Sequence, residues 1–115
     1  MATIVLRGRG DLSRIADGLL EGVLANGMSC ELVEQTERTV GGARIAFLVF
    51  EKFYYRASNR LSLSALLIEQ GGVIDATLVG AGGGQGPLLR FDWGSEENFA
   101  GVGAEVLEGL GFTRV

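Results

Sequence analysis

Residues 44–81 read Arg44-Ile45-Ala46-Phe47-Leu48-Val49-Phe50-Glu51-Lys52-Phe53-Tyr54-Tyr55, then a turn at Ala57-Ser58-Asn59-Arg60, a run from Leu61 to Gln70, the pair Gly71-Gly72, and a run from Val73 to Ala81. The first run is rich in β-branched and aromatic residues, which favour strands over helices. Two apolar runs joined only by Gly71-Gly72 indicate a two-residue hairpin, because both central positions of such a turn need a positive φ. This stretch therefore predicts three consecutive antiparallel strands.

The N-terminal residues predict a short strand followed by a helix. Thr3 to Leu6 is an apolar run, and Asp11 stands where a helix N-cap is expected. Apolar residues then recur at helical spacing, which predicts a helix over Leu12 to Ala25. Asn26-Gly27 is expected to end it, since both residues tolerate the left-handed conformation common after a helix. Its glycines, Gly18 and Gly22, are expected to let the helix lie close to the sheet.

A further strand is predicted between this helix and the central stretch. The run from Met28 to Thr36 alternates, with Met28, Cys30 and Leu32 on one side, which is typical of a half-buried strand. Residues 34–38 are polar, and Gly41-Gly42 supply the turn into Arg44.

The residues after the central stretch predict a loop, a strand and a second helix. Residues 80–87 contain five glycines and a proline, so they are expected to form a loop. Leu88 to Trp93 is predicted to be the last strand. Ser95 is the expected N-cap of a helix whose apolar stripe is predicted to consist of Phe99, Val102, Val106 and Leu110.

Together these elements predict an α+β fold with the order β-α-β-β-β-β-β-α. The strands cluster and the helices flank them, which favours two layers: a mostly antiparallel sheet of five to six strands with both helices on one face. The 115 residues have the usual length of one domain, so residues 1–115 are expected to form a single domain.

The composition of the chain indicates its cellular location and disfavours some classes of partner. The net charge of −4 disfavours binding to nucleic acid phosphates. The single cysteine cannot form an internal disulfide, which fits a cytoplasmic protein. No apolar run approaches the roughly 20 residues that a membrane-spanning helix needs, and no signal peptide is visible, so no membrane association is expected.

Six residues are candidates for ligand binding. Residues 51–60 combine basic and aromatic side chains, a composition that could contact a small molecule or, less readily in an acidic chain, a nucleic acid. A strand end emerging from the core would look the same. The glycine loop lacks the Lys and following helix of a phosphate-binding loop, but Gln85 is its lone polar residue. The candidates are Tyr54, Arg56, Asn59, Arg60, Gln85 and Trp93.

The inventory for catalysis and metal binding is thin. The chain has no histidine, the commonest general base and metal ligand. Cys30 lies on the apolar side of its predicted strand, which indicates an inert thiol rather than a nucleophile. No cofactor, metal or catalytic residue is predicted, and the residues disfavour an enzyme without excluding one.

The sequence also predicts self-association. In the strand after Arg44, Ile45, Phe47 and Val49 point to one face and the alternate residues to the other, yet both sets are apolar. Two helices can cover one face only, and an apolar face left open on a soluble protein usually marks an interface. A homodimer through the open faces, or through sheet edges, is therefore expected.

Several motifs together resemble a known family. They are the N-terminal strand and helix, the Gly-Gly turn, the run Phe50-Glu51-Lys52-Phe53-Tyr54-Tyr55 with Asn59-Arg60-Leu61-Ser62-Leu63, and the glycine loop with Gln85. On these, the chain resembles an uncharacterised family of small bacterial proteins, the domain of unknown function family 6054, over nearly its whole length. The resemblance implies a bacterial, single-domain, soluble protein and carries over no site residue.

These observations leave three hypotheses of function. A non-enzymatic, self-associating binding or interaction module comes first. A small-ligand-binding protein or enzyme, with its pocket between sheet and helices near the glycine loop, is the alternative. A nucleic-acid-binding module is the weaker one.

Overall fold

The central stretch forms three long antiparallel strands. A computed structural model of the chain describes residues 2–26, 29–54, 59–82 and 93–115, and for residues 54, 59 and 93–98 it describes the backbone only. Strands β3 (Ala43–Tyr54), β4 (Asn59–Gln70) and β5 (Val73–Gly82) pair in chain order. Gly71 and Gly72 join β4 to β5 with φ values of 61° and 82°, which confirms the predicted hairpin.

Three further strands complete a single antiparallel sheet. They are β1 (Ala2–Arg9), β2 (Cys30–Val40) and β6 (Thr113–Arg114). The six strands lie in the order β2-β3-β4-β5-β1-β6. β1 pairs with β5 along its whole length, from Ala2 opposite Gly80 to Arg9 opposite Val73. The N-terminal strand thus lies beside the last strand of the meander, and β2 forms one edge of the sheet.

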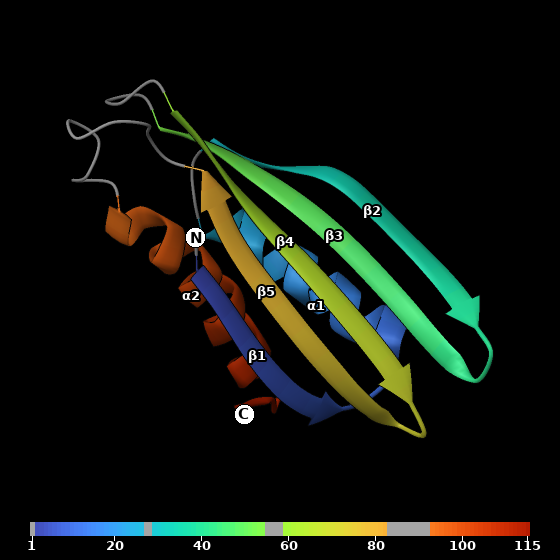
Figure 1. Cartoon of the computed structure of the whole chain (residues 1–115). Helices are drawn as coiled ribbons and strands as arrows, with labels where there is room; N and C mark the ends of the chain where they lie inside the picture. The colour runs from blue at the N-terminus through green and yellow to red at the C-terminus, as the bar shows by residue number, and fades with distance from the viewer. Residues whose placement is uncertain (1, 27–28, 55–58, 83–92) are drawn as a thin grey trace.

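Both helices cover the same face of this sheet. Helix α1 (Leu12–Ala25) packs on β2, β3 and β4, and helix α2 (Trp93–Gly109) packs on β1, β4 and β5. Figure 1 shows the two helices side by side behind the strands. The predicted α+β, two-layer arrangement is therefore confirmed. We call the sheet face away from the helices the open face.

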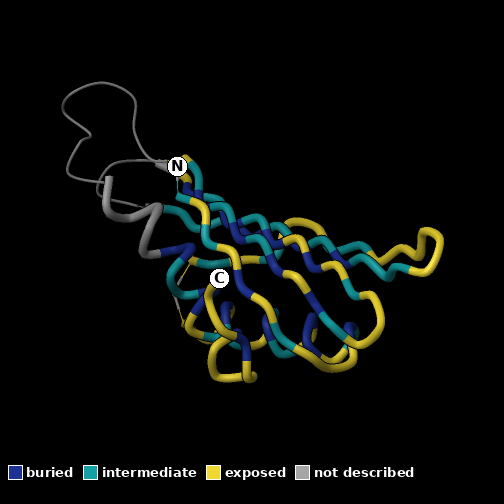
Figure 2. Tube along the Cα trace, turned by 60° about the horizontal axis from the view of Figure 1, so that its bottom comes forward, coloured by how far each residue is buried: buried dark blue, intermediate teal, exposed yellow. Residues whose placement is uncertain are grey.

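The core lies between the sheet and the helices. Alternate residues of each central strand are buried there, while the intervening residues of the open face stay partly exposed (Figure 2). The large side chains that are fully enclosed are Phe50, Leu6, Leu12, Leu19, Leu48, Leu63, Leu67, Ile74, Leu78, Leu107 and Val23. Burial of these apolar side chains supplies the main stabilisation of the fold.

The start of α1 is fixed by a polar cluster. Asp11 is the N-cap, as predicted, and its Oδ2 accepts a hydrogen bond from the backbone N–H of Arg14 at 3.2 Å. Arg44 on β3 approaches Asp11 at 3.3 Å and donates to the Ser13 hydroxyl at 2.9 Å. The Ser13 hydroxyl in turn donates to Glu37 on β2 at 3.0 Å. The cluster therefore ties the helix to two strands.

Acid should weaken this cap. The backbone hydrogen bond from Arg14, aided by the Arg44 guanidinium, holds the pKa of the Asp11 carboxyl below its ordinary value. A lowered folded-state pKa means that ionised Asp11 stabilises the fold above the unfolded-state pKa of about 3.9. That stabilisation is lost as the pH falls through the folded-state pKa. We expect the melting temperature to fall below about pH 4, and less steeply in Asp11→Asn, which still caps the helix.

Thermal melts followed by circular dichroism at several acidic pH values would check this expectation. Identical pH dependence in Asp11→Asn and the unmodified chain would contradict it.

The helix N-terminal to β2 was predicted correctly, but β2 itself differs from the prediction. It begins at Cys30 and continues to Val40, beyond the predicted end at Thr36. Pairing with β3 holds the polar residues in the strand, because an edge strand can turn them to solvent. The register shifts between Leu32 and Glu34, so the strand carries a bulge at Val33.

The C-terminal part needs more correction. The predicted strand Leu88 to Trp93 lies outside the described residues except for Trp93, which begins α2, so Ser95 lies inside the helix and is not its N-cap. The buried stripe of α2 consists of Phe99, Ala100, Gly103, Ala104 and Leu107. The predicted Val102 and Val106 are half-buried, and Leu110 is exposed. The short β6 was not predicted.

The helical glycines also pack differently from the prediction. A Cβ on Gly22 would lie 2.6 Å from Val106, and one on Gly18 would lie 3.1 Å from Leu110. Gly18 and Gly22 therefore bring α1 close to α2 rather than to the sheet. The glycine of α2 that approaches the sheet is Gly103, whose added Cβ would lie 3.2 Å from Leu63 and Leu78.

Candidate functional site

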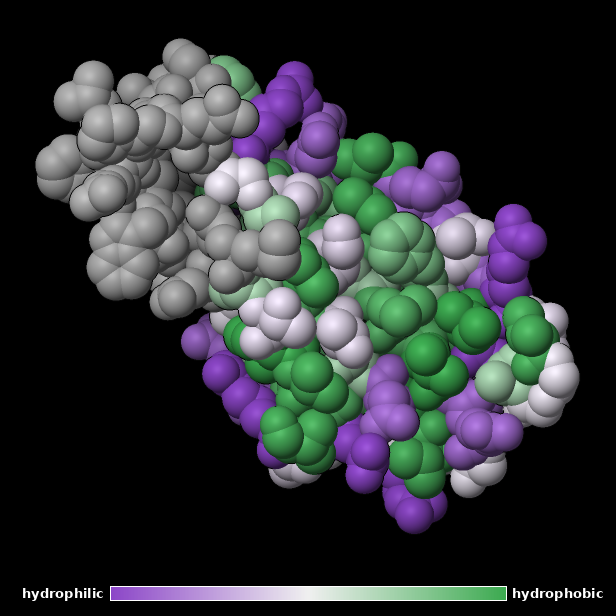
Figure 3. Space-filling model, in the orientation of Figure 1, coloured by the Kyte–Doolittle hydropathy of each residue, from purple (hydrophilic) through white to green (hydrophobic). Residues whose placement is uncertain are grey.

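An apolar surface lies on the open face of the sheet. The strand register places one residue set from each of four strands on this face. We call this set the open-face patch: Val5, Ile45, Phe47, Val49, Leu66, Ile68 and Val79. Its members Leu66, Ile68 and Val5 are 36%, 37% and 38% exposed. Figure 3 shows hydrophobic side chains gathered over the middle of the sheet.

Polar groups surround the patch. At one side Arg7 and Asp75, which are cross-strand neighbours, form an ion pair at 2.7 Å. At the other end Arg60 pairs with Glu51 at 2.9 Å, and its guanidinium lies 5.9 Å from the centre of the Phe53 ring. An apolar centre with a polar rim is the usual anatomy of a protein–protein interface.

The open face is electrically balanced although the chain is acidic. The register turns equal numbers of basic and acidic residues of the described strands to this face: Arg7, Arg9, Arg38 and Arg60 against Glu31, Glu34, Glu51 and Asp75. These charges cancel, whereas the whole chain carries −4. The open face therefore does not share the negative balance of the chain.

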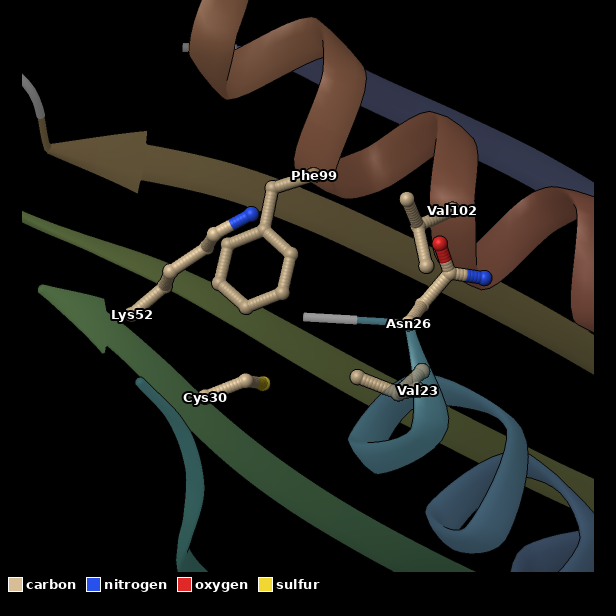
Figure 4. Close-up of a pocket in the computed structure, with 6 residues that line it drawn as sticks. All are labelled: Val23, Asn26, Cys30, Lys52, Phe99 and Val102. Atoms are coloured by element: carbon tan, nitrogen blue, oxygen red, sulfur yellow. The ribbon is translucent and has the colours of Figure 1, made fainter. Parts of the chain in front are cut away.

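A small cavity lies on the other side of the sheet, between the strands and the helices. It is lined by side chains from both helices, from β2 and β3, and from the residue after α1: Val23, Asn26, Cys30, Lys52, Phe99 and Val102. Its volume is about 10 Å³, room for about one water molecule. Figure 4 shows the Lys52 amine near the Phe99 ring, with the Cys30 sulfur pointing into the space between strand and helix.

The thiol in this cavity is not activated. Burial raises the pKa of Cys30, and this effect outweighs the opposing influence of the Lys52 ammonium. A thiol with a raised pKa is a poor nucleophile near neutral pH. Cys30 is partly buried and packs against the core.

The six sequence-predicted ligand residues are only partly described. Arg56 and Gln85 lie outside the described residues. Tyr54 and Asn59 are paired across the end of β3 and the start of β4, and Trp93 begins α2, but their side chains are not described. Arg60 is described, and it is held by the ion pair with Glu51. Whether the six residues form a binding site stays a prediction.

Of the loop predicted over residues 80–87, the structure describes Gly80, Ala81 and Gly82, and all three belong to β5 instead of the loop. The strand ends at Gly82. The φ of Gly82 is 99°, and an added Cβ would lie 2.4 Å from the Arg60 carbonyl oxygen. This glycine allows a close backbone approach between β5 and β4 at the point where β5 ends. The remaining glycines of the loop and Gln85 lie outside the described residues.

Sequence reasoning did not place Lys52 or Asn26 in the space between the sheet and the helices. Lys52 was considered only as part of the basic and aromatic segment, but it shares the helix-side face with Phe50, two residues earlier. The alternation of side chains along the strand would have predicted that Lys52 points to the same face as Phe50. Asn26 was interpreted as a helix terminator only. Its place beside Phe99 and Val102 depends on the packing of α1 against α2, which no local pattern specifies.

Neither a metal-binding cluster nor a membrane-spanning helix is found in the described part of the chain. Residues 2–26, 29–54, 59–82 and 93–115 contain no cluster of three or more cysteine, aspartate or glutamate side chains that could hold a metal ion. In the same ranges, neither helix is long and apolar enough to cross a membrane.

Comparison with known proteins gives a match to a protein family. The profile of a protein family described as "Family of unknown function (DUF6054)" matches residues 1–111. The curated proteins contain no match to the chain. The match spans both helices and the whole paired length of β1 to β5.

Proposed function

The chain belongs to this family of unknown function, and on that premise we propose that it is a non-enzymatic interaction module that self-associates through the open face of its sheet. The observation that carries the proposal is the open-face patch, an apolar area in the middle of the six-stranded sheet, on the face that the helices leave uncovered. Apolar area of this kind is costly to leave in water, so a partner surface is expected to cover it.

A second copy of the chain suits this face for two reasons. The charges of the described strands cancel on this face, so two copies can approach face to face without the repulsion expected from their acidic balance. Sheets pack face to face through interdigitating apolar side chains at about 10 Å, which needs no groove or protrusion. A two-fold homodimer is the commonest assembly with such a self-complementary surface, and it would bury at least about 1,000 Å².

The mass of the protein in solution tests this proposal. At micromolar concentration, light scattering should give about twice the chain mass. Leu66→Lys should reduce the mass to that of one chain, because it places a charge in the centre of the apolar contact. The matched control is Leu24→Lys on α1: Leu24 is 37% exposed against 36% for Leu66, but it lies on the helix layer.

Leu24→Lys should remain dimeric, and circular dichroism should show that both variants are folded. A monomeric unmodified chain at high concentration would overturn the proposal, as would a Leu66→Lys variant that stays fully dimeric.

A small-ligand-binding protein is the second candidate, favoured by the cavity between sheet and helices. Three side chains of different chemistry line this cavity: the carboxamide of Asn26, the ammonium of Lys52 and the aromatic ring of Phe99. Such a mixture of apolar surface with a few polar groups is typical of ligand pockets, although about 10 Å³ is far below the usual pocket volume. A thermal-shift screen of metabolites that gave a stabilising compound, lost in Lys52→Met, would favour this candidate over the first.

We also propose that the protein is a single-domain bacterial protein located in the cytoplasm. The lone cysteine fits a reducing compartment, because no intramolecular disulfide can form. Cell fractionation with an antibody against the protein would test the location.

A further inference from the structure

The free edge of β2 is a second surface with unused bonding capacity. Among the strands of the described residues, β2 pairs with β3 alone, so alternate residues along it direct their backbone N–H and C=O groups outward. Val40 and Ala43 flank the two-residue turn Gly41-Gly42 and so bond to each other. Counting back from Val40 in steps of two, the backbone groups of Arg38 and Thr36 also bond to β3. The backbone groups of the alternate residues, Thr39, Glu37 and Gln35, therefore face outward.

One hydrogen bond supports this assignment. The backbone N–H of Gln35 donates to the side-chain carboxylate of the preceding residue, Glu34, at 3.1 Å. A backbone N–H that is satisfied by a neighbouring exposed side chain is not engaged with β3. The bond thus marks Gln35 as one of the residues whose backbone groups lie on the free edge.

We propose that β2 pairs with β2 of a second copy of the chain, antiparallel and centred on Thr36, so that the two sheets become one continuous sheet. In this register Gln35 lies opposite Glu37 of the second copy, and both residues have outward backbone groups. They can therefore exchange both backbone hydrogen bonds, and the two-fold axis repeats the exchange. The second copy takes over the N–H of Gln35 and releases the carboxylate of Glu34.

The charges along the strand select this register. Glu34 and Arg38 stand two residues on either side of Thr36 and point to the same face, since they lie opposite Val49 and Ile45. In the register centred on Thr36, Glu34 of each copy therefore faces Arg38 of the other. Neither side chain has an ion-pair partner within the described residues, so both are free to form the new pairs.

Neighbouring registers are less favourable. A pairing centred on Glu37 would place two carboxylates opposite each other, and one centred on Arg38 would oppose two guanidinium groups. A pairing centred on Gln35 leaves Glu34 opposite Thr36 and Arg38 opposite Leu32, with no charge pair. Charged edge residues commonly block such pairing. In β2, however, Glu34 and Arg38 lie at equal distances from Thr36, so the register centred on Thr36 pairs opposite charges.

This edge contact is independent of the face contact proposed above and uses other residues. It is best measured in the Leu66→Lys chain, where the face contact is removed. Sedimentation equilibrium should show a monomer–dimer equilibrium in that chain at concentrations up to about 1 mM, where a contact with a dissociation constant of about 1 mM or less is detected. In the same background, E34R and R38E should each weaken association at least about tenfold, because two attractive charge pairs become repulsive.

Exchange of the charges should restore the contact. The double variant E34R/R38E should associate as the parent does, and an equimolar mixture of E34R and R38E chains should form a heterodimer. E31R is the matched control: it changes charge as E34R does, but residue 31 lies beyond the proposed pairs and should leave association unchanged. E34R also makes the acidic chain less negative, which by itself favours association, so a weakening would be specific to the pairing.

A parent chain that stays monomeric up to about 1 mM would overturn the edge contact, and so would a double variant that fails to recover. Failure of the face contact has a different signature, because Leu66→Lys would then leave the mass of the otherwise unmodified protein unchanged. In that case the same charge variants, made in the unmodified chain, decide the edge contact.

Discussion

Leu19→Ala and Phe99→Ala are each expected to lower the free energy of unfolding by about 2 to 5 kcal/mol. Leu19 on α1 is fully buried and Phe99 on α2 is only 5% exposed, and both belong to the core between helices and sheet. Truncation removes buried apolar atoms and leaves a cavity that the surrounding side chains fill only in part. Denaturation with urea or guanidinium chloride, extrapolated to water, measures the loss.

Leu24→Ala provides the control for this experiment. It makes the same chemical change on the same helix, but Leu24 is 37% exposed, so a loss of about 0.5 kcal/mol or less is expected. If Leu19→Ala and Phe99→Ala both lost no more than the control, α1 and α2 would not present these residues to the sheet.

Gly22→Ala is expected to destabilise the protein by about 1 to 2 kcal/mol, although alanine is the better helix former. At an open helix position this change gains about 0.5 to 1 kcal/mol. At Gly22, however, the added Cβ would lie 2.6 Å from a methyl group of Val106. The β-branched Val106 has little rotamer freedom in a helix, so α1 and α2 must move apart or distort.

Two further variants separate the effect of the steric clash with Val106 from the effect of alanine's higher helix propensity. Gly101 lies on α2 with nothing within 4 Å of an added Cβ, so Gly101→Ala should stabilise by about 0.5 to 1 kcal/mol. The pair Gly22→Ala/Val106→Ala should recover much of the loss, since it removes the clashing methyl groups. A Gly22→Ala variant as stable as the unmodified chain would show that the helices do not make this close contact.

Local signals predicted the elements that carry them. The α1 bounds, Leu12 to Ala25, follow from helical spacing between a capping Asp11 and a terminating Asn26. The strands β2 to β5 follow from strand-forming runs separated by turn sequences, two of which are glycine pairs, and the structure shows positive φ at Gly41, Gly71 and Gly72. Each of these signals lies within a few residues of the feature that it specifies.

Signals that depend on packing were misread. The predicted stripe of α2 consisted of large apolar residues and left out Leu107, but the buried side of the helix also contains Ala100, Gly103 and Ala104. Small residues let the helix backbone approach Leu63 and Leu78, and they give little hydrophobic signal in the sequence. β6 is two residues long, too short for any periodic pattern.

The candidate surfaces also differ in whether a local sequence signal was enough to predict them. Alternation of Ile45, Phe47 and Val49 was enough to predict an apolar second face, because it depends on strand geometry alone. The charge balance of that face and the pairing of Glu34 with Arg38 needed the register and the bulge at Val33, which shifts the faces of the residues after it. The cavity needed four elements to be placed together.

The pairing of β1 with β5 also sets an order for folding. The hairpins β2–β3, β3–β4 and β4–β5 join neighbours in the chain, so each closes a short loop at low entropic cost. β1 has no such neighbour: Ala2 must find Gly80, after α1 and the whole meander have emerged. On a ribosome the first strand to be synthesised therefore waits for the fifth, and its apolar residues remain unpaired until the meander is complete.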